Sequence, residues 1–161
     1  MLARLRAAGP ADAADIFRLI VDLATYEREP DAVVVTVDEL RAQLAAERPP
    51  FECLLAEDDD GAVVGFALYF HNYSTWRGRP GLYLEDLFVE PSRRGRGIGK
   101  QLLVRLAQLA VERGCARMEW AVLDWNTPAI GFYERLGARA VSEWTIFRLT
   151  GQELLNLAQS T

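Results

Sequence analysis

The segment RRGRGIGK, residues Arg93 to Lys100, decides the fold of this 161-residue chain. It follows an apolar stretch typical of a strand, Leu82 to Val89, and precedes an amphipathic helical pattern that ends near Gly114. At such a junction the free backbone N–H groups of the first helical turn and the helix dipole converge. Glycines let the backbone approach an anion closely, and the basic side chains add positive charge. The segment therefore predicts a phosphate-binding turn.

Two well-known nucleotide-binding motifs do not fit this turn. A P-loop needs glycine where Arg94 stands and Ser or Thr where Gln101 stands. A dinucleotide-binding fingerprint needs glycine at Lys100 and the first strand of the sheet before it, whereas this strand lies in mid-chain. The remaining alternative, a glycine-rich connection with solvated arginines, accounts less well for three alternating glycines among four basic residues.

The pattern outside the turn alternates helices and strands in an α/β order. A hairpin is expected at Asp60-Gly61, and a capping box of Thr36 and Glu39 begins a helix. The strand before the turn, the helix after it and the next strand form a strand, crossover helix, strand unit. The expected strands are 2–6, 51–57, 62–70, 82–89, 116–122, 138–141 and 143–149, with a loop at 71–81 and helices before Pro30, before Pro49, after the turn, at 127–136 and after Thr150. We expect one domain, residues 1–161, with a mixed, mostly antiparallel central sheet flanked by helices.

The composition excludes several classes of function. The chain is 50% hydrophobic and 25% charged, as globular proteins are, and its net charge of −5 argues against nucleic-acid binding. No apolar run is long enough to cross a membrane and the start lacks a signal-peptide core, so a cytoplasmic location is expected. Cys53 and Cys115 have no metal-ligand spacing and are expected to be buried free thiols, so no metal site is predicted.

Two adjacent carboxylates, Glu85 and Asp86, stand out in the strand before the turn. Neighbouring strand residues point to opposite faces, so at least one carboxylate faces a covered side of the sheet at a cost unless it is paired. The structural alternative is a strand-end pair satisfied by backbone amides or nearby arginines. Tyr133 can donate a proton while neutral, although its helical spacing with apolar residues is also that of a core aromatic. His71 is the only histidine, which leaves no Ser-His-Asp or Cys-His arrangement.

Arg94, Gly97 and Gly99 fit the signature Arg/Gln-x-x-Gly-x-Gly/Ala, and through it the chain resembles the GNAT-type N-acetyltransferases. The resemblance continues in LYLEDLFV (82–89) and WNTPAIGFYERLG (125–137). It is greatest to the diamine and polyamine acetyltransferases, which share ATYERE (24–29), an aromatic loop ending in Trp76, and LYLED. The resemblance implies the GNAT acyl-CoA N-acyltransferase fold, with acetyl-CoA as co-substrate and its pyrophosphate held by the turn.

The resemblance also implies which residues serve each reactant. By this resemblance, Glu85 assists deprotonation of the amine through water, and Tyr133 is the general acid beside the thioester sulfur. The strand offers backbone groups to the pantetheine. The residues expected to bind the coenzyme are Leu87, Phe88, Val89, Arg94, Gly95, Arg96, Gly97, Ile98, Gly99, Lys100, Asn126, Ala129 and Tyr133.

For the acceptor, the resemblance implies a site of acids and aromatic rings, both of which attract ammonium groups. The expected residues are Tyr26, Glu27, Trp76, Glu85, Asp86, Glu119 and Trp120. As ordinary structural features, Glu27 would be a solvated helix end and the tryptophans core or interface anchors. Where polyamine enzymes carry an acid before the loop tryptophan, this chain has Ser74 and Thr75. This difference removes a possible anchor for a distal amine, so a diamine, a lysine analogue or another primary amine fits nearly as well as a polyamine.

The predicted function is direct acetyl transfer from acetyl-CoA to a primary amine of a small cationic acceptor. Two alternatives stay open: an enzyme that acetylates protein or peptide amines, and a non-catalytic acyl-CoA sensor that contacts a protein partner through Tyr73 and Trp76. The family often forms dimers and the terminal helix is apolar, so a homodimer is expected.

Overall fold

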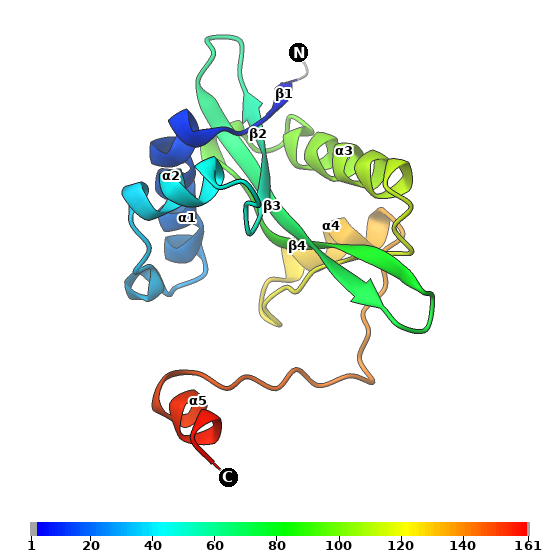
Figure 1. Cartoon of the computed structure of the whole chain (residues 1–161). Helices are drawn as coiled ribbons and strands as arrows, with labels where there is room; N and C mark the ends of the chain where they lie inside the picture. Colours follow the sequence, from blue (N-terminus) through cyan, green and yellow to red (C-terminus); the bar gives the residue numbers. More distant parts are fainter. Residues whose placement is uncertain (1–2, 161) are drawn as a thin grey trace. The chain divides into compact units, whose positions relative to one another are not determined.

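The computed structural model describes residues 3–160, which group into two compact units, one ending at Ala121 and one beginning at Val122. The first unit holds the sheet and three longer helices (Figure 1). Its elements are β1 (Arg4–Ala7), α1 (Ala13–Tyr26), α2 (Val37–Ala45), β2 (Glu52–Glu57), β3 (Val63–Ser74), β4 (Arg79–Val89), α3 (Ile98–Glu112) and β5 (Met118–Glu119). The second unit holds α4 (Thr127–Arg135) and α5 (Gly151–Ala158). Within 3–160, none of the helices has the length and apolar character that a membrane crossing needs.

The five strands of the first unit lie in sequence order, β1-β2-β3-β4-β5. The first four pair antiparallel, and β4 pairs parallel with β5. A parallel neighbour requires a crossover connection, and α3 supplies it. The mixed, mostly antiparallel sheet and the strand, crossover helix, strand unit are thus confirmed.

Helices cover both faces of this sheet, with α1 and α2 on one side and α3 on the other (Figure 1). Ile16 and Leu19 of α1 are fully buried against Phe66 of β3, and Leu102 and Leu106 of α3 are equally buried. Each fully buried large apolar side chain stabilises the fold by about 1.5–3 kcal/mol. This two-sided core fixes β4, the strand that leads into the turn.

Local sequence signals located several boundaries correctly. The capping box at the start of α2 is present: Thr36 Oγ1 accepts from the Glu39 N–H (3.2 Å), and a Glu39 carboxylate oxygen accepts from the Thr36 N–H (2.8 Å). The predicted hairpin joins β2 to β3, with Gly61 in a left-handed conformation at φ 78°. Gly114 follows α3 with φ 69°, as the C-terminal glycine of a helix does.

The prediction of a loop over residues 71–81 is wrong. β3 runs on to Ser74 and β4 begins at Arg79, so that only a four-residue turn, 75–78, connects them. The polar composition at His71 and Asn72 indicated a loop, but these two residues pair with Leu82 and Gly81 of the facing strand. Backbone pairing with the facing strand prevails there over the polar composition.

The prediction of two strands at 138–141 and 143–149 is also wrong, because this stretch has no regular secondary structure. A strand exists only when another strand takes its backbone hydrogen bonds, and the described part of the second unit contains helices alone. α5 begins after Thr150 as expected, although that side chain makes no capping hydrogen bond. The strand expected at 116–122 shortens to β5.

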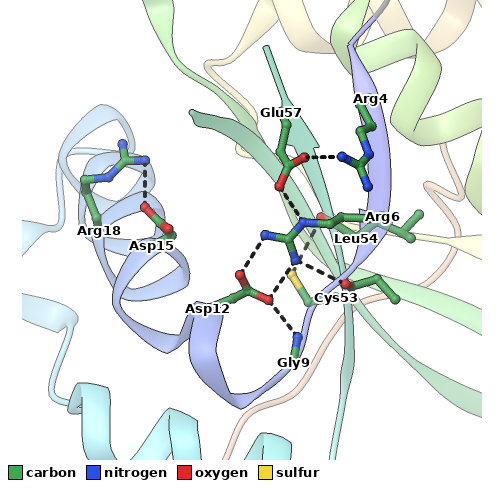
Figure 2. A network of polar contacts seen from close by, with 10 residues as sticks. Arg4, Arg6, Gly9, Asp12, Asp15, Arg18, Cys53, Leu54 and Glu57 are labelled. Carbon is green, nitrogen blue, oxygen red and sulfur yellow. Dashed lines mark hydrogen bonds and ion pairs between the residues drawn. The ribbon is translucent and has the colours of Figure 1, made fainter. Parts of the chain in front are cut away.

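A polar network ties the start of the chain to the sheet (Figure 2). The Arg6 guanidinium of β1 holds both carboxylate oxygens of Asp12 at 2.8 and 2.9 Å, and its Nε donates to Glu57 of β2. Asp12 also accepts from the Gly9 N–H at 2.8 Å. The hydrogen bonds from Arg6 hold the pKa of Asp12 below its ordinary value. The network thereby joins β1, the entry to α1 and β2.

We expect Asp12→Asn to lower the free energy of unfolding by about 1–3 kcal/mol at pH 7, the usual worth of hydrogen bonds to a charged group. Because the folded-state pKa of Asp12 is lowered, the stabilisation is present above its ordinary pKa and is lost as the pH falls through the lowered value. Urea unfolding of both proteins between pH 2 and pH 7 measures the difference, which should vanish at the acid end.

The matched control is Asp38→Asn. Asp38 is 92% exposed and pairs with Arg41 on the surface of α2. Such a pair contributes at most about 1 kcal/mol, so this change should be close to neutral. Equal losses in the two variants would show that the Arg6 network has no special role.

Candidate active site

A β-bulge lies at the acidic pair of β4. Leu68 of β3 pairs with Asp86, and the next residue, Tyr69, pairs with Leu84, so Glu85 is the extra residue. A bulge interrupts the alternation of side chains between the two faces of a sheet and re-aims those beside it. The expectation that Glu85 and Asp86 point to opposite faces assumed a regular strand, and this strand is irregular there.

Three carboxylates gather at the bulge. Asp86 is partly buried, and this burial, together with the charges of Glu85 and of Glu27 at the end of α1, raises its pKa to about 6. Burial also raises the pKa of Glu27. Glu85 itself is exposed. The structure thus brings together three of the predicted acceptor residues in a negatively charged site, here called the acidic cluster (Glu27, Glu85, Asp86).

The edge of β4 is open beyond this point. Parallel pairing with β5 covers only Leu82 and Tyr83, and β4 continues to Val89 without a β5 partner among the described residues. The side chains of Phe88 and Val89 are buried, so these residues can meet a ligand chiefly through their backbone. Such an edge offers hydrogen-bonding groups to an extended molecule lying along it.

The turn after β4 has the conformation that its glycines predict. Gly95 and Gly97 take left-handed φ values of 78° and 80°, and Gly97 is the N-cap of α3. A Cβ at either position would meet nothing within 4 Å, so the backbone conformation, not crowding, requires glycine. The first hydrogen bond of the helix is donated by the Gln101 N–H to the Gly97 carbonyl (2.9 Å). Among the described residues, the N–H groups of 95–100 have no acceptor, which suits a diphosphate.

The basic residues of the turn divide into two pairs. Arg93 forms an ion pair with Asp58 at 2.8 Å, and the Arg94 Nε donates to the Val89 carbonyl at 2.9 Å. Arg96 and Lys100 are exposed and make no ion pair with any residue of 3–160. Arg96 and Lys100 are therefore the side chains best placed to meet a phosphate, whereas Arg93 and Arg94 hold the turn against the sheet.

The other predicted acceptor residues lie at different distances from the acidic cluster. Glu119 of β5 pairs with Tyr83 in the sheet and holds Arg117 at 2.6 Å. Burial, followed by the charges of Glu85 and Glu119, raises the pKa of Tyr83. Trp120, directly after β5, is partly buried.

Trp76 is not brought to the acidic cluster within this unit. It lies in the turn at the tip of the β3–β4 ribbon and is 87% exposed. The strand from Arg79 to Glu85 spans about 20 Å at 3.3 Å per residue. A small acceptor at the bulge therefore does not span the distance to Trp76.

Three predicted residues belong to the second unit. Asn126 is the buried N-cap of α4, and its side-chain oxygen accepts from the Ala129 N–H at 3.4 Å. Tyr133 lies about two turns after Asn126 in α4, is partly buried, and has its ring centre 5.5 Å from that of Phe132. The N-terminus of α4 therefore carries both residues expected to contact CoA, on the same helix as the expected acid.

Two acids that support the turn were missed by sequence reasoning. Glu90 accepts from Arg18 of α1 at 2.5 Å, while the same guanidinium donates to the Val63 carbonyl at 2.7 Å. Asp58, the partner of Arg93, lies in the β2–β3 turn. Both pairs join residues far apart in the sequence, so no local pattern indicates them.

Residues 14–138 match the Acetyltransferase (GNAT) family. A thialysine N-epsilon-acetyltransferase of Bos taurus is 41% identical over 96% of both chains, and an L-ornithine N5-acetyltransferase of Arabidopsis thaliana is 34% identical over 96% of this chain and 87% of that one. An integron cassette protein from the mobile metagenome of V. cholerae has a similar structure, with a TM-score of 0.82 and 29% identity over 99% of each chain.

We expect Asp86→Asn to raise the free energy of unfolding by about 1–2 kcal/mol at pH 8, because it removes a partly buried charge beside two like charges. The folded-state pKa of Asp86, about 6, is raised, so the wild type gains stability below the ordinary pKa of 3.8 and loses it as the pH rises through about 6. Urea unfolding at pH 4 to pH 8 should show this fall in the wild type and not in the variant.

Asp59→Asn is the control, since Asp59 is exposed in the β2–β3 turn. Its stability should follow the wild type within about 0.5 kcal/mol at every pH. If Asp86→Asn destabilises the protein at pH 8, the carboxylate is not held at an electrostatic cost.

Proposed function

This chain belongs to the GNAT family of N-acetyltransferases, and we propose that it transfers the acetyl group of acetyl-CoA to a primary amine of a small cationic acceptor. One observation carries the proposal. A single strand, β4, leads from the acidic cluster directly into the glycine turn, so that a site for a cation and a site for a diphosphate adjoin one another.

Residues of the turn would hold the coenzyme. The unpaired N–H groups of 95–100, with Arg96 and Lys100, suit the pyrophosphate, and the open edge at Leu87 to Val89 suits the pantetheine. Asn126 and Ala129 of α4 complete the proposed set. Acetyl-CoA supplies an acetyl group activated as a thioester.

The acidic cluster would receive the acceptor. Carboxylates attract its ammonium group, but a primary alkylamine has a pKa near 10.4 and must lose a proton before it attacks. Glu85, exposed at the bulge, takes that proton through water, while Asp86, with a pKa of about 6, is ionised at pH 7 and holds the cation. As the C–N bond forms and the C–S bond breaks, the Tyr133 hydroxyl donates a proton to the departing sulfur. No covalent enzyme intermediate is needed.

The relatives support an amine at the end of a short chain as acceptor. The bovine relative is named for the ε-amine of thialysine and the Arabidopsis relative for the N5 amine of L-ornithine. Both are primary amines at the end of an amino-acid side chain. We therefore place lysine analogues and ornithine-like amines first among the acceptors, ahead of longer polyamines.

We also propose that the two units form one domain, since the family match over 14–138 crosses their boundary. A homodimer is supported by the large apolar side chains that the terminal segment exposes: Trp144, Ile146, Phe147, Leu154, Leu155 and Leu157. Two free cysteines, Cys53 and Cys115, suit the reducing cytoplasm.

The proposed function predicts acceptor-dependent release of CoA thiol from acetyl-CoA. Thialysine, ornithine and short diamines should stimulate release well above the rate with buffer alone, and peptides with free amino termini should not. Gly97→Glu is the control, because it strains a left-handed position and places a carboxylate at the phosphate site. Peptides acting as the best acceptors would indicate a protein acetyltransferase, and coenzyme binding without any acceptor-dependent release would indicate a sensor.

Tyr133→Phe should lower kcat by about 10²-fold or more with little change in the Kd of acetyl-CoA, because it removes the proton donor for the departing sulfur. Steady-state kinetics with the best acceptor, and calorimetry for the Kd, separate the two effects. The matched control is Tyr73→Phe, which removes the same hydroxyl from a side chain that is 61% exposed on the β3–β4 ribbon. Unchanged turnover of Tyr133→Phe would remove this residue from the mechanism.

A further inference from the structure

Arg94 is held by three groups of the first unit. Its Nε donates to the Val89 carbonyl at 2.9 Å, and its guanidinium carbon lies 4.8 Å from the centre of the Tyr26 ring and 5.3 Å from that of Phe88. Both ring distances fall within the roughly 6 Å of a cation–π contact. One side chain at the start of the turn therefore contacts both the end of β4 and the end of α1.

The end of α1 carries an acceptor residue directly after this contact. Tyr26 is the last residue of the helix and Glu27 follows it, with its N–H bonded to the Leu23 carbonyl at 2.8 Å. Arg28 has a left-handed φ of 67°, a conformation that a non-glycine residue keeps only where its surroundings impose it. The position of Glu27 therefore depends on how the helix end is held.

From this position Glu27 acts on Asp86, another member of the acidic cluster. Its charge contributes to the raised pKa of Asp86, so the two carboxylates lie within electrostatic reach. Arg94 of the turn contacts Tyr26, Glu27 follows Tyr26 in the chain, and the charge of Glu27 acts on Asp86 of β4. All of these residues lie in the first unit.

We infer that Arg94 is a positioning residue for the acceptor: by its contact with the Tyr26 ring it fixes the end of α1, and with it Glu27 of the acidic cluster, and so couples the coenzyme turn to the amine site. The inference rests on the proposed function. It differs from the role of Arg96 and Lys100, whose exposed side chains would serve the coenzyme alone. Because the contact depends on a planar guanidinium, lysine cannot replace it even though the charge is kept.

The test compares Arg94→Lys with Arg96→Met. Arg94→Lys should raise the KM of the best acceptor about five- to tenfold at saturating acetyl-CoA, while the Kd of acetyl-CoA changes less than about threefold. Arg96→Met should do the reverse: it should weaken the binding of acetyl-CoA and leave the acceptor KM near the wild-type value. If Arg94→Lys weakens only the binding of acetyl-CoA and leaves the acceptor KM unchanged, the inference is overturned while the proposed function stands. If the wild type itself shows no acceptor-dependent release, it is the proposed function that fails.

Variants of Tyr26 supply a second, independent measurement. Tyr26→Leu removes the aromatic ring that Arg94 contacts and should raise the acceptor KM as Arg94→Lys does. Since the two residues act through their mutual contact, the Arg94→Lys, Tyr26→Leu double variant should be no worse than the more impaired single variant. A KM increase equal to the product of the two single effects would show that they act separately, and would contradict the coupling.

Discussion

The left-handed backbone at Gly95 and Gly97 is the constraint on which the remaining structure depends. Only this curl turns successive N–H groups toward one point at the start of α3. The curl is useful only if the strand before it and the helix after it are fixed, and the core provides this by burying α1 and α3 on opposite faces of the sheet. The ion pairs of Arg93 with Asp58 and of Arg18 with Glu90 add two anchors at the start of the turn.

The acidic cluster, by contrast, is held at an electrostatic cost. Asp86 would be easier to bury as a neutral residue, and its raised pKa records the unfavourable surroundings of its charge. The bulge at Glu85 leaves a ladder position unpaired as well. Folding stability alone explains neither feature, whereas a bound ammonium group would offset the repulsion among the three carboxylates.

Sequence patterns predicted the elements whose signals are local. The Thr36 capping box, the Asp60-Gly61 hairpin and the crossover at the turn each depend on residues a few positions apart, and all three are present. The bulge at Glu85 was not predictable, because it is defined by the register of β3 against β4. The ribbon at 71–81 was misread for a related reason, since its polar residues form a strand only when paired. The stretch 138–149 shows the converse: its sequence pattern predicted strands, but no partner strand is present within residues 3–160 and none form.

The turn also shows why counting basic residues overstates an anion site. Arg93 is neutralised by Asp58, but Arg94 binds a neutral carbonyl and aromatic rings, so its charge remains beside those of Arg96 and Lys100. Positive potential is thereby concentrated at the carboxyl end of β4, while the three carboxylates give negative potential at its bulge. The net charge of the protein is −5, so the positive potential at the turn is a local feature that the overall charge does not reveal. This separation of charge sorts two reactants of opposite sign onto adjoining sites, because the bulge within β4 and the turn after its carboxyl end each attract one of them and repel the other.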